Sequence, residues 1–181
     1  MQHFSMQIRM LHPKEYGILR EFLYQAIYIP KGAEPPSRSV IDLPELQVYI
    51  ASFGTRPDDH CLVAEVKGKI VGAVWSRIME DYGHVDEHTP SLAVSLLPEY
   101  RNQGIGTQLL NRLLDLLLMN GYHQASLSVQ KENPAARLYR RLGFRVLKEN
   151  DTEYLMLKKL SRTKFQTDKD KDNTTQKDLS L

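Results

Sequence analysis

Cysteine is nearly absent from this chain of 181 residues, in which Cys61 is the only one. A single thiol excludes an internal disulfide, a CxxC redox pair and a cysteine-based zinc site. The chain therefore lacks the covalent crosslinks of small secreted scaffolds. We expect it to work in a reducing compartment, the cytoplasm.

Long apolar runs are also lacking. The richest apolar stretch, 113–119, is interrupted by Asp115 and is far shorter than the roughly 20 residues of a membrane span. The N-terminal sequence MQHFSMQIRMLHPKE has no cationic start followed by an apolar run, the pattern of a signal peptide. We therefore expect neither a signal peptide nor a membrane partner.

Neither sign of charge is in clear excess. The chain has 24 basic and 22 acidic side chains and a formal net charge of +2. Because a nucleic-acid surface usually needs a marked basic excess, we expect no nucleic-acid partner. Apolar residues make up 41% and charged residues 25%, which are the proportions of an ordinary globular protein, and the length suits one domain.

The composition changes at residue 161. From there to residue 181 the chain is polar, with alternating Lys and Asp at 168–172. Such a segment has too little apolar surface to offset the entropy lost on ordering. We therefore predict one folded domain over 1–160 and a disordered tail over 161–181.

Apolar periodicity and turn residues predict alternating strands and helices. Strands are expected at 4–10, 61–66, 70–79, 91–97, 125–129, 145–148 and 154–158, and helices at 13–27, 44–53, 106–119 and 134–142. The strand 91–97, the helix 106–119 and the strand 125–129 form a βαβ unit, whose two strands should be parallel. The fold class is therefore α/β (or α+β), with helices covering a mixed sheet.

The segment between the strand 91–97 and the helix 106–119 carries the clearest chemical signal. It reads PEYRNQGIGT, from Pro98 to Thr107. The first N–H groups of a helix have no intrahelical partner and lie at the positive end of the helix dipole. Glycines at 104 and 106 remove side chains, so an anion can touch the backbone. These features predict a phosphate-binding turn, although glycines also serve plain strand-to-helix turns.

The spacing excludes two common phosphate-binding loops. A Walker loop needs Gly-Lys-Ser/Thr after four spacer residues, which this chain lacks. A dinucleotide fingerprint needs a third glycine three residues after Gly106, where Leu109 stands. The remaining pattern is Arg-x-x-Gly-x-Gly, starting at Arg101.

A second motif follows, ENPAARLYRRLGF, from Glu132 to Phe144. Together with the first motif in its strand–turn–helix context, it resembles the GCN5-related N-acetyltransferase (GNAT) family. The resemblance covers roughly residues 4–160 and is strongest over 91–144. It implies a mixed, mostly antiparallel central sheet flanked by helices, with a parallel βαβ unit at 91–129.

The resemblance also implies a co-substrate, acetyl-CoA, and no metal. The pyrophosphate would lie on the main-chain N–H groups of the turn that Arg101 opens, and the pantetheine arm would pair with the preceding strand. A main-chain amide of that strand would polarise the thioester carbonyl. These roles fall on Val94, Ser95 and Leu96 in the strand and on Asn102, Gln103, Gly104, Ile105, Gly106 and Thr107 in the turn.

Tyr139 is the residue that the resemblance assigns to catalysis, as the acid that protonates the leaving thiolate. A phenol with a pKa near 10 stays protonated at neutral pH, which suits this task. The alternative is a half-buried tyrosine that only packs a short helix. Asn133 precedes Pro134 and should cap that helix. We also expect Asn133 to contact coenzyme A, although it lies six residues before Tyr139 where many relatives have seven.

No general base can be assigned from the resemblance to the family, because the positions where relatives have an acid are not acidic here. Relatives often place a Glu in the stretch that corresponds to 88–91 or at the position of Ser128, and this chain has no acid at either. The remaining candidates lie in the loop before the strand 91–97, where His88 is expected nearest to the acetyl group; the alternative is a solvated acidic loop. They are Glu80, Asp81, His84, Asp86, Glu87 and His88. Gly83 and Pro90 argue against a helix that would place His84 and His88 on one metal.

The acceptor is expected to be a primary amine of a small molecule or a peptide, recognised by the N-terminal helices and the loop 29–41. Two functions remain open. The first is an acetyl-CoA-dependent N-acetyltransferase in which the amine attacks the thioester directly in a ternary complex. The second is a non-catalytic acyl-CoA sensor or regulatory module. A homodimer is possible by analogy with other members of the fold.

Overall fold

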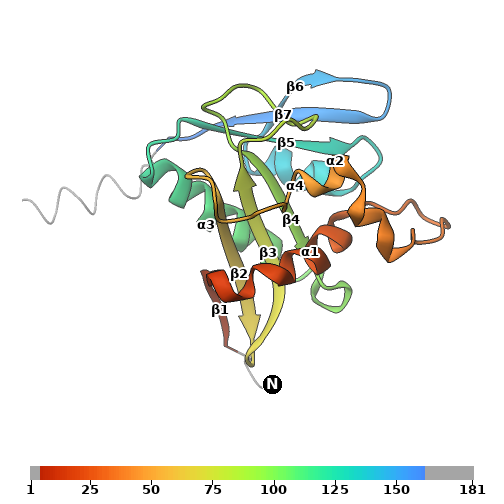
Figure 1. Cartoon of the computed structure of the whole chain (residues 1–181). Coiled ribbons are helices and arrows are strands. Elements are labelled where there is room, and N and C mark those ends of the chain that lie inside the picture. Colours follow the sequence, from red (N-terminus) through yellow and green to blue (C-terminus); the bar gives the residue numbers. More distant parts are fainter. Residues whose placement is uncertain (1–4, 162–181) are drawn as a thin grey trace, which may run out of the picture.

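The computed structural model describes residues 5–161. Within them the chain forms a seven-stranded sheet in the order β1-β2-β3-β4-β5-β7-β6 (Figure 1). The strands are β1 (Met6–Met10), β2 (His60–Val66), β3 (Lys69–Arg77), β4 (Ser91–Leu96), β5 (Gln124–Gln130), β6 (Arg145–Glu149) and β7 (Glu153–Lys159). All seven predicted strands are present.

The helices alternate with these strands. The α-helices are α1 (Leu19–Ala26), α2 (Pro44–Gln47), α3 (Ile105–Met119) and α4 (Ala135–Arg141), and the 3-10 helices are η1 (Pro13–Ile18), η2 (Arg38–Asp42) and η3 (Pro98–Tyr100). The single helix predicted over 13–27 is therefore a 3-10 turn followed by an α-helix.

The helix predicted over 44–53 is wrong beyond Gln47. The carbonyls of Val48 and Ala51 accept hydrogen bonds from the guanidinium of Arg77, at 3.1 and 2.7 Å. Ser52 has a φ of 52°, which no right-handed helix allows. A side chain from β3 thus takes the carbonyls that would otherwise extend the helix.

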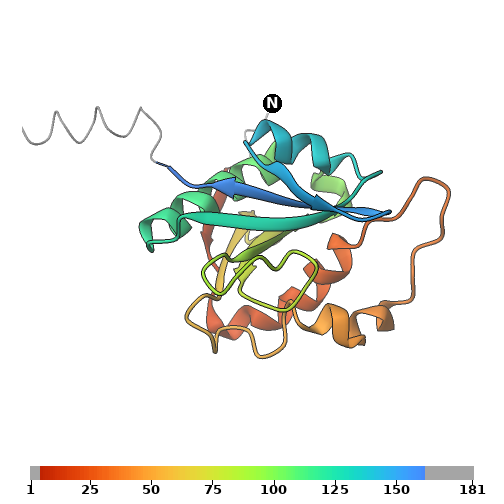
Figure 2. The same cartoon turned by 90° about the horizontal axis from the view of Figure 1, so that it is seen from above.

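The sheet is mixed, as predicted, and mostly antiparallel. Every neighbouring pair is antiparallel except β4 and β5, which are parallel and pair only at Ser91 and Ser126. The unit β4–α3–β5 is the predicted βαβ unit. Beyond its first residue β4 diverges from β5, and Figures 1 and 2 show β5 and β7 running at a steep angle to β2, β3 and β4. The sheet is thus split into two halves.

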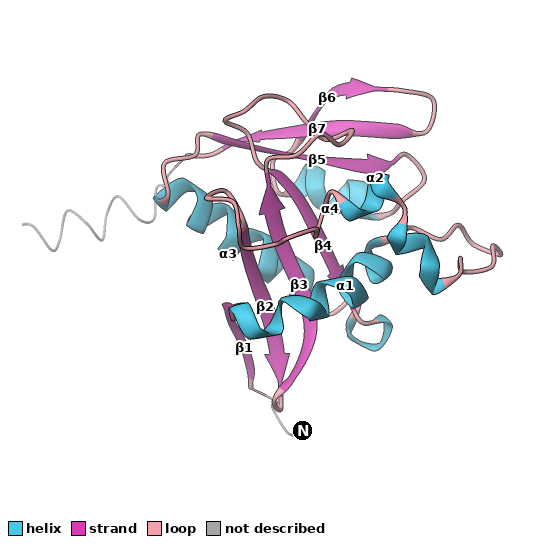
Figure 3. Ribbon diagram, viewed as in Figure 1, coloured by secondary structure: helices cyan, strands magenta, loops and turns pink. Residues whose placement is uncertain are grey.

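Helices cover both faces of the sheet (Figure 3). One core cluster combines α3 and α4 with the sheet, and a second combines α1 and η2 with the opposite face. Val94 and Leu96 of β4 pack on the α3 side, whereas Ser95 donates a hydrogen bond to the Phe22 carbonyl of α1 at 2.6 Å. Alternate side chains of β4 therefore face opposite layers, as a pleated strand requires.

Two sequence expectations concern the ends and the surroundings of the domain. Residues 1–4 and 162–181 lie outside the described residues, so the disordered tail at 161–181 stays a prediction. Between residues 5 and 161 no helix has the length and apolar character needed to cross a membrane.

Cys61 is buried, and burial raises the pKa of its thiol, so it serves as a small core residue.

Candidate active site

The turn between β4 and α3 presents a row of main-chain donors. The first hydrogen bond at the head of α3 runs from the N–H of Gln108 to the carbonyl of Gly104, at 3.2 Å. None of the N–H groups from Asn102 to Thr107 donates to a described residue. These groups lie at the N-terminal end of α3, which is the positive end of its dipole, and such an arrangement binds anions.

The glycines keep this turn open. Gly104 adopts a φ of +81°, the left-handed region that glycine tolerates best, and a Cβ built there would meet nothing within 4 Å. A Cβ on Gly106 would come no closer than 3.8 Å to the Leu96 side chain. A ligand can therefore reach the backbone at both positions.

Arg101 faces the protein in this structure. Its Nε donates to the Leu96 carbonyl at 3.1 Å, and its Nη2 donates to Gln25 Oε1 at 3.0 Å. The side chain thus fastens the end of β4 to the C-terminal end of α1. This contact positions the turn, and a contact of Arg101 with the cofactor stays a prediction.

The edge of β4 toward β5 is open where the strands diverge. The Pro90 carbonyl accepts a hydrogen bond from Ser126 N–H at 3.0 Å, so it faces β5. Main-chain groups alternate in direction along a strand, so those of Val94 and Leu96 face the same way. Because β4 and β5 pair only at Ser91 among the described residues, these groups have no strand partner, and the Leu96 carbonyl bonds instead to the Arg101 side chain. An extended ligand arm could occupy that position.

Tyr139 lies in α4 on the α3 side of the sheet. It is 8% exposed, its ring meets Phe144 edge-on at 6.1 Å, and its hydroxyl bonds to no described residue. Burial raises the pKa of Tyr139 to about 12, so the phenol is protonated at neutral pH. The residue therefore packs the core and also keeps a proton available.

Asn133 is a helix cap, as predicted. Its Oδ1 accepts a hydrogen bond from the N–H of Ala135 at 2.9 Å. The preceding carbonyl, of Glu132, accepts a hydrogen bond from the Tyr28 hydroxyl at 3.1 Å. The loop after α1 is thereby linked to the β5–α4 loop, and a cofactor contact of Asn133 stays a prediction.

Asp81 is the member of the 80–88 loop that lies at the divergence of β4 and β5. Its Oδ2 accepts a hydrogen bond from the Tyr49 hydroxyl at 2.8 Å, and its Oδ1 accepts one from Ser91 Oγ at 3.1 Å. Burial raises the pKa of the Asp81 carboxyl, although both hydroxyl donors oppose this shift. Tyr49 carries no recognisable signal in the sequence, because it lies 32 positions before Asp81 and only the fold brings the two residues together.

The histidines of this loop lie elsewhere. His88 is exposed and lines a cavity of 680 Å³ with residues 120–124, beyond the C-terminal end of α3 and thus at the opposite end of that helix from the glycine turn. His84 Nε2 lies 3.7 Å from Glu87 and 3.9 Å from Glu80. Their potential ligand atoms lie within 4.8 Å of one another, so His84 groups with two glutamates and not with His88.

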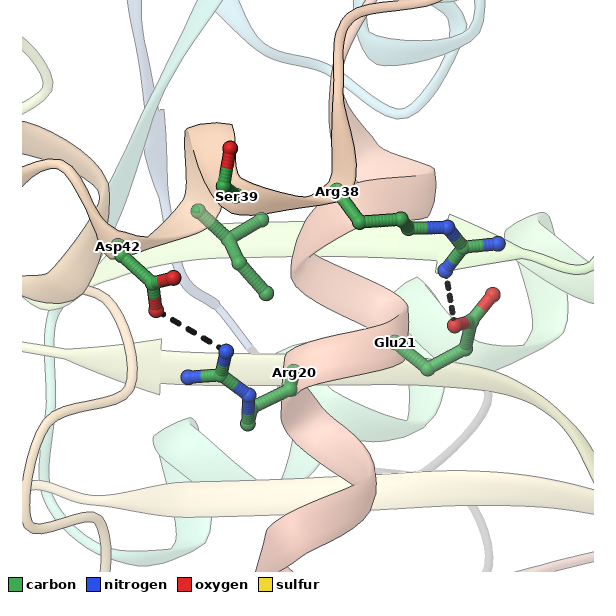
Figure 4. Close-up of a pocket in the computed structure, with 6 residues that line it drawn as sticks. Arg20, Glu21, Arg38, Ser39 and Asp42 are labelled. Carbon is green, nitrogen blue, oxygen red and sulfur yellow. Dashed lines mark hydrogen bonds and ion pairs between the residues drawn. The ribbon is translucent and has the colours of Figure 1, made fainter.

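A surface pocket of 420 Å³ lies between α1 and η2 (Figure 4). Its charged side chains are paired, Arg20 with Asp42 at 3.0 Å and Arg38 with Glu21. Arg38 also stacks 4.1 Å from the Tyr24 ring centre, and the Tyr24 hydroxyl donates to the Pro36 carbonyl. This pocket belongs to the region where acceptor recognition is expected, but its charges already neutralise one another.

Known proteins resemble this chain in sequence and in fold. A thialysine N-epsilon-acetyltransferase from Mus musculus is 31% identical over 108 residues, a match that covers 55% of this chain and 63% of the relative. The chain thus spans less than two thirds of that curated relative.

Two solved structures share the fold. The PaiA N-acetyltransferase from Thermoplasma acidophilum, in complex with coenzyme A, has a TM-score of 0.64 at 21% identity and covers 86% of this chain and 99% of its own. A GNAT family acetyltransferase from Brucella melitensis, in complex with acetyl-CoA, has a TM-score of 0.57 at 22% identity and covers 88% and 91%. The acetyltransferase (GNAT) family model matches residues 23–144, from α1 through the glycine turn to α4. The chain therefore belongs to the GNAT acetyltransferase family.

Proposed function

We propose that this protein transfers the acetyl group of acetyl-CoA to a primary amine of a small molecule, by direct attack in a ternary complex. The observation that carries the proposal is the row of N–H groups from Asn102 to Thr107, which have no acceptor among the described residues and lie where the open edge of β4 ends. A diphosphate on the turn and an extended arm along β4 fit one continuous ligand. Coenzyme A has this form, and the family membership agrees with it.

The backbone supplies most of the cofactor contacts in this proposal. The N–H groups at 102–107 hold the pyrophosphate, and Val94, Ser95 and Leu96 run beside the pantetheine arm. An N–H of this strand that faces β5 donates to the thioester oxygen as negative charge develops there. Such contacts depend on main-chain geometry, so the side chains of the turn can vary.

Tyr139 acts as the acid in this scheme. The amine nitrogen forms a bond to the carbonyl carbon, the carbon–sulfur bond breaks, and the Tyr139 hydroxyl gives its proton to the sulfur. Burial favours the neutral forms of both phenol and thiol, because desolvation raises the pKa of each. The buried site therefore favours protonation of the leaving thiolate, although the phenol itself is a weak acid.

The name of the mouse relative supports an amine at the end of a flexible side chain as acceptor, since thialysine carries one. An amine of this kind is a cation at neutral pH, with a pKa near 10.4 for lysine. We therefore place lysine analogues and short polyamines first in the acceptor series to be tested.

The test of the proposal is thiol release from acetyl-CoA across a series of amines, for the wild type and Tyr139→Phe. We expect turnover by the wild type and a fall of about 10²-fold or more in kcat for the variant, at unchanged affinity for coenzyme A. Tyr122→Phe is the matched control, because Tyr122 lies beyond the opposite end of α3. Binding of acetyl-CoA without turnover on any amine would instead indicate an acyl-CoA sensor.

The cofactor part of the proposal has its own test. Gly104→Val puts a side chain over the donor row, whereas Gly121→Val carries a similar backbone strain, at a φ of +87°, at the other end of α3. Calorimetry with coenzyme A should show a loss of about tenfold or more in affinity for the first variant only. Equal affinities for the two variants would refute the phosphate site at 102–107.

A further inference from the structure

The polar side chains at the divergence of β4 and β5 lie together on one face of the sheet. Ser91 belongs to the β4 side chains that face α1, because Ser95 on the same pleat bonds to Phe22 of α1. Ala125, Leu127 and Val129 of β5 pack in the α3 core, so Ser126 and Ser128 face the other way. Asp81 bonds to Ser91 on this face, and Tyr139 lies on the opposite one.

Asp81 has only neutral partners there. Its side chain accepts hydrogen bonds from the hydroxyls of Tyr49 and Ser91, and the main-chain N–H groups of Gly83 and Asp81 also lower its pKa. No lysine, arginine or histidine of residues 5–161 forms an ion pair with it. A half-buried carboxylate without a cation has unbalanced charge, which an incoming ammonium group would neutralise. Among residues 5–161, the other charged group that acts on Tyr49 is the carboxylate of Glu153 in β7, which raises the Tyr49 pKa.

Neighbouring groups fix the position of this carboxylate. Trp75 Nε1 donates to the Tyr49 carbonyl at 3.2 Å, which holds the backbone of Tyr49 against β3. A Cβ on Gly83 would come 3.0 Å from Asp81 Oδ2 and 3.3 Å from Ser91 Oγ, so the loop closes tightly around Asp81. Burial, reinforced by the charge of Asp81, raises the pKa of Tyr49, which remains a hydrogen-bond donor throughout the physiological range.

We propose that Asp81 binds the acceptor amine and takes its proton during acetyl transfer, and that Tyr49 positions the Asp81 carboxylate. This inference rests on the proposed function, because it assumes that the thioester lies in the gap between β4 and β5. The acid, Tyr139, and the base, Asp81, then lie on opposite faces of that gap. The amine enters from the α1 face and the sulfur leaves toward α4.

The protons balance in this scheme. The ammonium group first loses one proton to water, and the neutral nitrogen attacks the carbonyl carbon. The nitrogen becomes positively charged and strongly acidic as the carbon–nitrogen bond forms, so a carboxylate is basic enough to take its proton. The carbon–sulfur bond breaks as Tyr139 gives a proton to sulfur, and the proton on Asp81 returns to Tyr139 through water. One proton is released per amide formed.

The decisive experiment compares Asp81→Asn with Glu80→Gln, an adjacent carboxylate whose side chain is 86% exposed. Using the best amine from the acceptor series, we expect Asp81→Asn to lower kcat/KM for the amine by about 10²-fold or more at unchanged coenzyme A affinity. Glu80→Gln should stay within about threefold of the wild type. A wild-type rate in Asp81→Asn, with Tyr139→Phe impaired, would overturn this inference and leave the proposed function standing.

Tyr49→Phe separates a positioning role from a structural one. The Tyr49 hydrogen bond lowers the pKa of Asp81, so its loss should move the acidic limb of the kcat/KM profile to higher pH. Asp81→Asn should abolish that limb. An unchanged limb in both variants would overturn the inference even if both were less stable. Absence of turnover by the wild type on every amine would overturn the proposed function and this inference with it.

Discussion

Two aspartates on the same face of the sheet, Asp59 and Asp81, show what separates a structural charge from a functional one. Asp59 binds Arg77 through both carboxylate oxygens, at 2.7 and 2.9 Å, and both side chains are fully buried. Asp81 accepts hydrogen bonds from two hydroxyl groups, and no cation among residues 5–161 pairs with it. The fold neutralises the first charge and leaves the second for a ligand.

The pKa directions follow the same division. Burial pushes the pKa of Asp59 upward, but Arg77 and the N–H groups of Gly54 and Arg56 outweigh it, so the pKa is lowered. For Asp81 burial outweighs the hydroxyl donors, and the pKa is raised. The two sites also depend on each other. Arg77 binds the carbonyls of Val48 and Ala51 and so holds the segment that contains Tyr49, the hydrogen-bond donor to Asp81.

The largest expected effect is the loss of stability on substitution of Asp59, whose charge the fold neutralises. Asp59→Ala leaves the Arg77 guanidinium buried without its counter-charge, which should lower the free energy of unfolding by about 3–5 kcal/mol. Asp81→Asn removes no ion pair, and we expect a change of less than about 1 kcal/mol. Urea unfolding at neutral pH measures both. Equal losses in the two variants would show that Asp81 is also a structural charge.

An intermediate effect is the pH dependence of stability, which should have opposite signs at the two sites. The lowered pKa of Asp59 stabilises the folded state above the ordinary aspartate pKa of 3.8, and this contribution is lost as the pH falls through the folded-state value. The raised pKa of Asp81 means that its carboxyl stays protonated to a higher pH in the folded state than in the unfolded chain. Its contribution therefore falls as the pH rises from 3.8 through the folded-state value.

Urea unfolding of the wild type and of Asp81→Asn from about pH 3 to about pH 8, a range that includes the aspartate pKa, tests the direction of the pH dependence at Asp81. Relative to the wild type, the variant should gain stability as the pH rises through the folded-state pKa of Asp81. A stability difference independent of pH would mean that Asp81 titrates as it does in the unfolded chain.

An effect as small as that of Asp81→Asn should come from the hydroxyl that joins Tyr49 to Asp81. Tyr49→Phe should reduce the free energy of unfolding by about 0.5–1.5 kcal/mol, the usual contribution of one hydrogen bond. Tyr24→Phe, which removes the hydroxyl bonded to the Pro36 carbonyl, is the matched control. Thermal unfolding should rank both well below Asp59→Ala, and a larger loss in Tyr49→Phe would make Tyr49 a structural residue first.

The parts of the fold with strong local signals could be predicted from the sequence. The helix at 105–119 and the strand at 91–96 have clear apolar patterns, and the glycines at 104 and 106 mark the turn between them. The family motifs at 98–107 and 132–144 lie in this region. Local pattern was sufficient there because neighbours in sequence are also neighbours in space.

The acceptor side of the site could not be predicted in this way. The sequence offers Asp81 as one of six candidates in a polar loop and favours His88, which the fold places in a cavity with residues 120–124. The sequence predicts a helix over the segment that contains Tyr49, and Arg77 of β3 interrupts that helix. Each of these contacts joins residues distant in sequence, and periodicity carries no information about them.

The single backbone pair between Ser91 and Ser126 has a consequence for how the molecule responds to its co-substrate. The two halves of the sheet share almost no interstrand hydrogen bonds, so an extended molecule inserted between them acts as an additional strand and joins them. Ligand occupancy then contributes directly to the free energy of folding. Saturation with coenzyme A should accordingly make the two halves of the sheet unfold as one cooperative unit. It should also slow amide hydrogen exchange in the strands on both sides of the divergence between β4 and β5.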